Sequence, residues 1–216
     1  MRVQMVLRLI ALAVGCMAAL GLTATGADKR LQIVALGDSL TAGLGLASQD
    51  AFPAKLQKAL AAKGVVVTIS NAGVSGDTMS GGLARLDWSV PPGTDAVILE
   101  LGANDALRGT DPAVTRGALD SILSALAKRK IPVLLCGMLA PRNLGADYAR
   151  TFDPIFPDAA KIYGTVFYPF FLDGVVADRK LNQGDGLHPT AAGVDVIVGK
   201  MLPKVEELIA RAKAPR

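Results

Sequence analysis

The stretch Leu31-Gln-Ile-Val-Ala-Leu36-Gly37-Asp38-Ser39-Leu40 places a short apolar run directly before a polar turn that contains a serine. An apolar run of this length, bounded by turn residues, is typical of a strand covered on both faces. Similar runs recur at residues 65–69, 96–101, 133–136 and 165–168. The sequence therefore predicts five buried strands, with Ser39 just beyond the end of the first.

Longer segments with the apolar periodicity of helices separate these runs. They span residues 51–63, 78–86, 112–129, 147–163 and 191–212. Alternating strands and helices predict an α/β fold of three layers, in which a five-stranded parallel sheet carries helices on both faces. With the common strand order 2-1-3-4-5, the first strand lies between the second and the third.

Polar clusters follow four of the five predicted strands: residues 37–39, 71–78, 102–105 and 185–188. Ligands of open parallel sheets bind outside the carboxyl ends of the strands, where the strand order reverses. In the predicted order, Ser39 is therefore flanked by Gly76 and Asn104. A backbone N–H without a side chain in the way and a side-chain amide are both suitable donors to a developing oxyanion.

A serine hydroxyl needs a base within hydrogen-bond reach to act as a nucleophile, and the base needs an orienting group. His188 is the only histidine in the chain, and Asp185 precedes it by three residues. Each residue also has a structural alternative. Ser39 could cap a helix, Asn104 could be a turn residue, and Gly76 could supply a positive φ.

The four clusters together resemble a known family. The residues that carry the resemblance are, in chain order, Gly37-Asp38-Ser39-Leu40, Gly76, Gly102-x-Asn104-Asp105 and Asp185-x-x-His188. In this order they resemble the four blocks of the SGNH (GDSL) hydrolases, and the segments around them are similar to the branch of small periplasmic arylesterases, thioesterases and lysophospholipases. No Gly-x-Ser-x-Gly elbow of the ordinary α/β-hydrolases is present.

The resemblance implies a flavodoxin-like fold and a role for each matched residue. Ser39 is the implied nucleophile, His188 the general base and then acid, and Asp185 the residue that orients His188. The backbone N–H groups of Ser39 and Gly76 and the Asn104 side chain form the implied oxyanion hole. No cofactor and no metal are expected.

The implied reaction is hydrolysis of carboxylic esters with aryl or short-to-medium acyl groups, and the branch extends it to thioesters and lysophospholipids. Leu107, Leu139, Pro141 and Leu144 are the predicted wall of the substrate pocket, since they are apolar and follow strands at the active edge. Two alternatives remain open: a carbohydrate O-acetyl esterase on the same scaffold, and a ligand-binding module without catalysis.

The N-terminal residues 1–27 have the pattern of a secretory signal peptide. Arg2 and Arg8 precede the uncharged run from Leu9 to Leu22, and small residues follow up to Ala27. Cleavage after Ala27 would leave one domain, residues 28–216, which we expect in a bacterial periplasm. An uncleaved anchor and lipidation at Cys16 are the alternatives.

The charge and cysteine content exclude several classes. Of 23 basic and 19 acidic residues, two arginines and no acidic residue fall in positions 1–27, so removing them lowers the net charge from +4 to +2. That balance does not fit a nucleic-acid-binding domain. One histidine and Cys136, which lies in an apolar run, are too few ligands for a zinc site. We expect a monomer without an internal disulfide that binds only small ester or thioester substrates and, after cleavage, no membrane.

Overall fold

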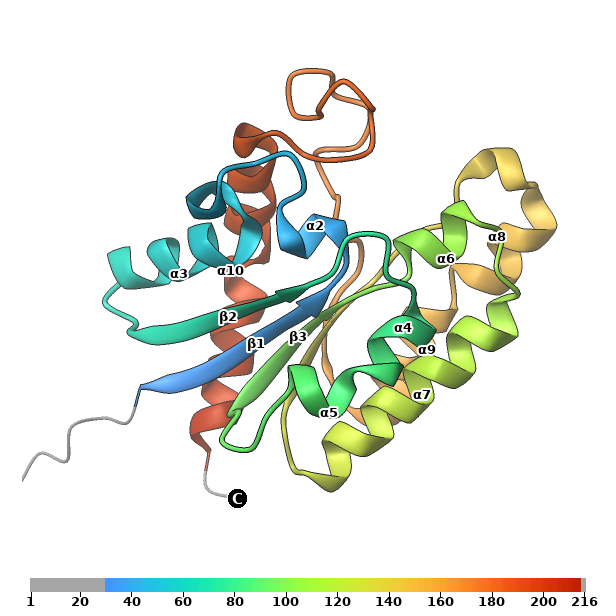
Figure 1. Ribbon diagram of the computed structural model, residues 1–216. Coiled ribbons are helices and arrows are strands. Elements are labelled where there is room, and N and C mark those ends of the chain that lie inside the picture. Colours follow the sequence, from blue (N-terminus) through green and yellow to red (C-terminus); the bar gives the residue numbers. More distant parts are fainter. Residues whose placement is uncertain (1–29, 215–216) are drawn as a thin grey trace, which may run out of the picture.

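The computed structural model describes residues 30–214 and contains one sheet of five parallel strands (Figure 1). The strand order is β2-β1-β3-β4-β5, which confirms the predicted 2-1-3-4-5 arrangement. The strands are β1 (Leu31–Gly37), β2 (Val67–Gly73), β3 (Ala96–Glu100), β4 (Val133–Cys136) and β5 (Val166–Tyr168). The predicted signal peptide and Cys16 lie outside the described residues.

Helices cover both faces of the sheet. α3 (Phe52–Ala62) and α10 (Ala191–Lys213) pack against each other on one face, and α4 (Met79–Ala84), α7 (Pro112–Lys128) and α9 (Ile155–Tyr163) pack on the other (Figure 1). α7 shows why these segments are amphipathic helices. Its buried residues recur every three or four positions and therefore form one apolar stripe; they are Thr115, Ala118, Leu119, Ile122, Leu123 and Leu126.

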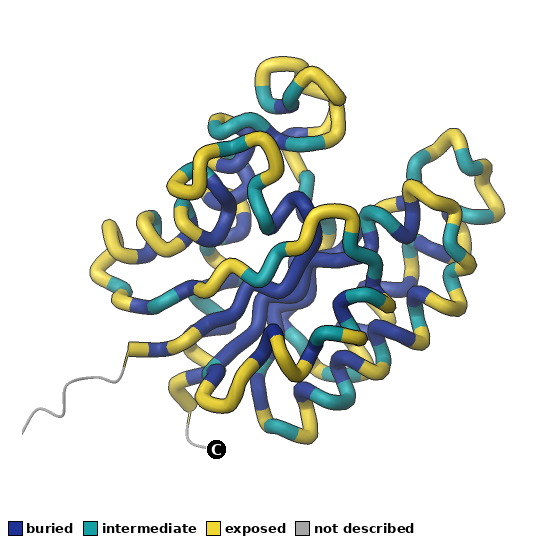
Figure 2. Tube along the Cα trace, in the orientation of Figure 1, coloured by how far each residue is buried: buried dark blue, intermediate teal, exposed yellow. Residues whose placement is uncertain are grey.

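The core is centred on β1, β3 and β4, which are mostly dark blue in Figure 2, whereas the connecting loops are largely exposed. All five residues of β3 are buried, including the carboxyl-bearing Glu100. Cys136, at the end of β4, is buried as predicted, and burial raises the pKa of its thiol. Among residues 30–214, no helix combines the length and apolarity needed to cross a membrane.

Several boundaries differ from the sequence-based expectation. β2 begins at Val67 instead of residue 65, because the Val65 N–H closes α3 by donating to the Leu60 carbonyl, and it extends to Gly73 along the whole of β1. The segment 147–163 forms two helices, α8 (Ala146–Phe152) and α9, with Pro154 between them. Proline lacks the N–H that a continuous helix needs.

The predicted helix over residues 78–86 is also divided, at Arg85, into α4 and α5 (Leu86–Ser89). Short elements that the periodicity did not predict lie next to the strand ends: α2 (Ser39–Ala42), α6 (Ala103–Leu107) and the 3-10 turns η1 (Ser48–Asp50) and η2 (Arg142–Leu144). Two of these unpredicted elements, α2 and α6, contain the candidate site residues Ser39 and Asn104.

Candidate active site

Ser39 is the first residue of α2 and follows β1 after a single residue, Asp38. Asp38 caps this helix, because its side chain accepts the Leu40 N–H at 2.9 Å. The capping alternative for Ser39 is therefore not realised. Instead, the Ser39 hydroxyl lies 2.8 Å from Nε2 of His188, and only 7% of the residue's surface is exposed.

His188 and Asp185 complete a chain of hydrogen bonds to Ser39. Nδ1 of His188 lies 2.6 Å from Oδ2 of Asp185. The other carboxylate oxygen accepts the backbone N–H groups of Leu187 at 2.9 Å and His188 at 3.0 Å. The N–H of His188, its ring and the N–H of Leu187 together lower the pKa of Asp185 to about 2. Asp185 is consequently ionised at neutral pH and can orient the imidazole and stabilise its positive charge.

The loop that carries His188 is tied to the loop after α2 by Gln183. The Gln183 side-chain amide donates to the carbonyls of Leu44 at 2.8 Å and Pro189 at 2.9 Å. The Gln183 backbone N–H also donates to the carbonyl of His188 at 2.7 Å. Gln183 therefore fixes the base relative to the nucleophile. Gln183 was not predicted as a site residue, because no local sequence pattern signals a contact between positions 139 residues apart.

The oxyanion hole that the resemblance implies includes two backbone N–H groups, those of Gly76 and Ser39. Gly76 is the third residue of a β-turn closed by the Asp77 N–H and the Val74 carbonyl, and its φ of +82° is the conformation that a type II turn requires there. Among the described residues, no acceptor is bonded to the N–H of Gly76 or of Ser39. Both groups are therefore available to bind an oxyanion.

Asn104 lies beside them in α6, but its side-chain amide is already bonded. Nδ2 donates to Oδ2 of Asp38 at 3.1 Å and to the carbonyl of Asp77 at 2.9 Å. These bonds hold the three strand-end loops together. As a third oxyanion donor, Asn104 would have to exchange one of these acceptors for the substrate oxygen.

Two side chains brace the loop that contains Gly76. Arg85 donates from Nε to Asp77 at 2.7 Å and from Nη2 to the Gly37 carbonyl at 2.8 Å. Arg108, directly after α6, donates to the carbonyl of Gly76 at 2.8 Å. Neither was singled out from the sequence, although both lie in segments that resemble the family. Arg85 stands between α4 and α5, and its side chain reaches back to the site.

A buried carboxyl group lies beneath the nucleophile. Oε2 of Glu100 accepts the hydroxyl of Thr41 at 2.6 Å and the N–H of Asp38 at 3.3 Å, whereas Oε1 is buried without a partner among the described residues. Burial and the nearby Asp38 carboxyl raise the pKa of Glu100 well above its usual value, and burial also raises the pKa of Asp38 to about 6. Burial therefore favours the neutral form of Glu100.

The close fit of this carboxyl group explains the glycine before Asp38. A Cβ on Gly37 would overlap the Thr41 hydroxyl and Oε2 of Glu100. Only a residue without a side chain can therefore end β1 at this position.

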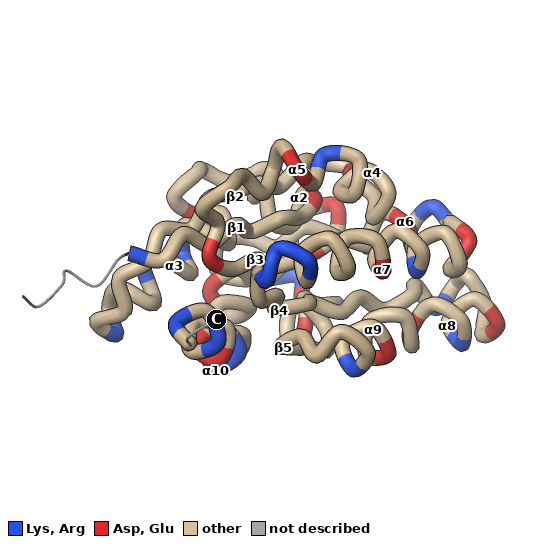
Figure 3. The backbone as a smooth tube through the Cα atoms, turned by 90° about the horizontal axis from the view of Figure 1, so that it is seen from below, with Lys and Arg blue, Asp and Glu red and all other residues tan. Residues whose placement is uncertain are grey.

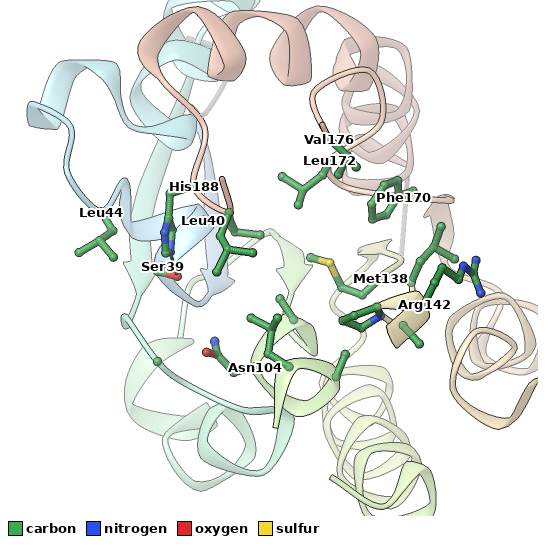
Figure 4. Close-up of a pocket in the computed structure, with 18 residues that line it drawn as sticks. Ser39, Leu40, Leu44, Asn104, Met138, Arg142, Phe170, Leu172, Val176 and His188 are labelled. Atoms are coloured by element: carbon green, nitrogen blue, oxygen red, sulfur yellow. Dashed lines mark hydrogen bonds between the residues drawn. The ribbon is translucent and has the colours of Figure 1, made fainter. Parts of the chain in front are cut away.

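Ser39 and His188 open into an apolar cavity of about 600 Å³ (Figure 4). This volume is in the range of small-molecule sites. Gly76 and Asn104 also line the cavity, and its other lining residues are Leu40, Leu44, Ala103, Ala106, Leu107, Met138, Leu139, Ala140, Pro141, Arg142, Phe170, Leu172, Val176 and Leu187. The arrangement can place an acyl chain in an apolar space while its carbonyl carbon approaches Ser39.

Three of the four residues expected to form the pocket wall line this cavity: Leu107, Leu139 and Pro141. Leu144 does not, because it ends the 3-10 turn η2, which leads the chain from the cavity to α8. The part of the first three in substrate binding stays a prediction.

Comparisons with known proteins agree with this geometry. The model of the GDSL-like lipase/acylhydrolase family matches residues 35–196. Esterase TesA of Pseudomonas aeruginosa is 37% identical, over 90% of this chain and 96% of its own length. Thioesterase 1/protease 1/lysophospholipase L1 of Escherichia coli is 35% identical, over 82% of this chain and 84% of its own.

A solved structure extends the likeness to three dimensions. AlinE4, described as an SGNH-hydrolase family esterase, is 46% identical and superimposes with a TM-score of 0.71, over 83% of this chain and 96% of its own. The residues matched by the family model, 35–196, include all four polar clusters.

Proposed function

Because the chain belongs to the GDSL-like lipase/acylhydrolase family, we propose that it hydrolyses carboxylic esters through an acyl-enzyme on Ser39. One observation carries the proposal: the hydrogen-bonded series Ser39–His188–Asp185 opens into an apolar cavity of about 600 Å³. A nucleophile, a base and an oriented carboxylate in this geometry are the machinery of acyl transfer.

The reaction begins when Nε2 of His188 accepts the proton of Ser39, whose oxygen attacks the acyl carbon. The N–H groups of Ser39 and Gly76 stabilise the oxyanion of the tetrahedral intermediate. His188 then donates the proton to the leaving alcohol or thiol. Water, deprotonated by His188, attacks the acyl-enzyme and releases the acid, so that Ser39 regains its proton.

The substrate class follows from the cavity and the relatives. Relatives are named esterase, arylesterase and thioesterase/lysophospholipase. The apolar lining suits aryl and short-to-medium acyl groups, and the mechanism applies equally to thioesters and lysophospholipids. Small-molecule esters are the substrates that we propose, for a monomeric enzyme exported after cleavage behind Ala27. Intact-mass analysis of exported protein should then find Asp28 as the first residue.

The test of the catalytic proposal is Ser39→Ala on an aryl ester and with a fluorophosphonate probe. We expect loss of hydrolysis by about 10⁴-fold or more, by analogy with other serine triads, and no labelling. The matched control is Ser48→Ala, which replaces an exposed serine of η1 and should retain both hydrolysis and labelling. A Ser39→Ala protein that kept a tenth of the activity would exclude Ser39 as the nucleophile.

A further inference from the structure

The cavity ends in one charged side chain, at the side away from the nucleophile. Of the residues that line the cavity, Arg142 is the only lysine, arginine, aspartate or glutamate. In Figure 4, Ser39 and His188 lie on one side of the cavity, Met138 and Phe170 come next, and Arg142 lies farthest from Ser39. An acyl chain bound to Ser39 and extending through the apolar space therefore approaches Arg142 with its far end.

A second cavity, of about 560 Å³, is also bordered by Arg142. Arg142 is the residue that lines both cavities, and the others that line the second are Gly145, Ala146, Ala149, Arg150, Asp153 and Pro154. Arg142 is thus the residue at which the apolar cavity adjoins space that a longer chain could use.

An ion pair holds the Arg142 side chain in place. Nη1 of Arg142 lies 2.9 Å from Oδ2 of Asp153, at the junction of α8 and α9. Oδ1 of Asp153 accepts the N–H of Ala140 at 2.8 Å, and Ala140 lines the first cavity. One carboxylate therefore fixes both the arginine and the backbone of the cavity wall.

The pairing decides what the arginine can do. Since its charge already has a partner, an anionic group on the substrate would have to compete with Asp153 for it. An apolar chain that separated or displaced the pair would offer no hydrogen bonds in return. Displacement of the pair by an apolar chain is therefore unfavourable.

We propose that Arg142, held by Asp153, sets the longest acyl chain that the enzyme accepts. The inference rests on the proposed function and adds a specificity-determining residue to it. Its removal should join the two cavities and admit longer chains. Because 67% of the Arg142 side chain is exposed, its replacement should not unfold the protein.

The experiment measures kcat/KM for p-nitrophenyl esters with acyl chains of increasing length, from acetate to palmitate. Each methylene that enters the apolar cavity should raise kcat/KM, by up to about fourfold. The rise should stop in the wild type where the chain reaches Arg142. In Arg142→Ala the rise should continue over several further carbons, and Asp153→Asn, which keeps an acceptor for Ala140, should shift the limit in the same direction.

Arg150→Ala is the matched control, since Arg150 lines only the second cavity. Its profile should coincide with that of the wild type. If folded Arg142→Ala and Asp153→Asn both kept the wild-type limit, the inference would be wrong. The proposed function would stand in that case, because it depends on the acetate activity of the wild type and its loss in Ser39→Ala.

Discussion

Asn104 illustrates, at the scale of a single residue, how a candidate catalytic group also holds the site together. Its amide nitrogen donates to Asp38 and to the carbonyl of Asp77. An oxyanion carries more charge than the Asp77 carbonyl, and the pKa of Asp38 is raised to about 6, so its carboxylate is destabilised by burial. A tetrahedral intermediate can therefore compete for one of these hydrogen bonds.

Asn104→Ala should consequently lower kcat far more than it raises KM. The loss of one donor to an oxyanion typically costs about 10²–10³-fold in rate, because the charge develops only in the transition state. Steady-state kinetics on an aryl ester provide the measurement. An effect confined to KM would place Asn104 in ground-state binding of the substrate.

His188 and Asp185 belong to one series of hydrogen bonds, yet their loss should differ in severity. Without His188, nothing in the site can accept the Ser39 proton. Without Asp185, the imidazole remains but lacks its 2.6 Å partner. In a comparable triad the base is worth about 10⁶-fold and the carboxylate about 10⁴-fold in kcat.

We therefore expect His188→Ala to be at least about ten times less active than Asp185→Ala. The rates of both variants can be compared under single-turnover conditions with an activated ester. Equal activity of His188→Ala and the wild type would contradict the mechanism.

At the scale of the elements, two helices are followed by a residue with a positive φ. After α3, Gly64 takes a φ of +77°, and after α7, Lys130 takes a φ of +56°. In both places the N–H groups of this residue and of the one after it close the helix in the Schellman pattern. After α7, the Lys130 N–H donates to the Ala127 carbonyl and the Ile131 N–H to the Leu126 carbonyl. Basic residues gather at this end of α7 (Figure 3), with Lys128 in its last turn, where they complement the helix dipole, but the positive φ of Lys130 is strained for a residue with a side chain.

Lys130→Gly should therefore stabilise the protein, by about 1 kcal/mol, since glycine adopts this φ without strain. The free energy of unfolding from urea titrations measures the change. Gly64→Ala is the reciprocal control: no atom lies within 4 Å of the added Cβ, so its expected destabilisation isolates the cost of positive φ. A destabilised Lys130→Gly would mean that the lysine charge outweighs the strain.

The sequence predicted those elements whose apolar pattern is long or continuous. The five strands, α3, α7 and α10 were located within a few residues, because burial on one stripe or on both faces determines their composition. α6 escaped prediction because it has five residues and begins after Gly102, whose φ is +110°. The hydrogen-bonded series Ser39–His188–Asp185 could be predicted, since the chain has one histidine. Gln183 and Glu100 could not, because they bind partners that lie 139 and 62 residues away in the sequence.

For the whole molecule, the buried carboxyl groups make stability depend on pH. In the unfolded chain Glu100 releases its proton near its usual pKa of 4.5, whereas the folded protein retains it. Asp38 behaves in the same way, because its pKa is raised from 3.8 to about 6 in the folded protein. The unfolded state thus binds fewer protons above pH 4.5, and folding stability falls as the pH rises. Asp185 acts oppositely: its contribution is present above pH 3.8 and is lost as the pH falls to about 2.

Glu100→Gln should flatten the dependence of stability on pH between 5 and 8. The glutamine keeps an acceptor for Thr41 and Asp38 but has no proton to lose, so a slope of up to about 1.4 kcal/mol per pH unit disappears. Urea titrations of both proteins across this range test the slope and not the absolute stability, which the buried amide also changes. Parallel curves for wild type and Glu100→Gln would show that Glu100 ionises normally.

The distance along the chain between the nucleophile and its base has a consequence for biosynthesis. Ser39 follows the first strand, and His188 precedes the last helix, 149 residues later. A ribosome therefore completes the sheet before the base emerges, and the nascent polypeptide remains inert toward esters until its final loop docks beside α2. The appearance of hydrolytic turnover should therefore report the docking of this loop, and a chromogenic ester can follow it during refolding or cell-free translation.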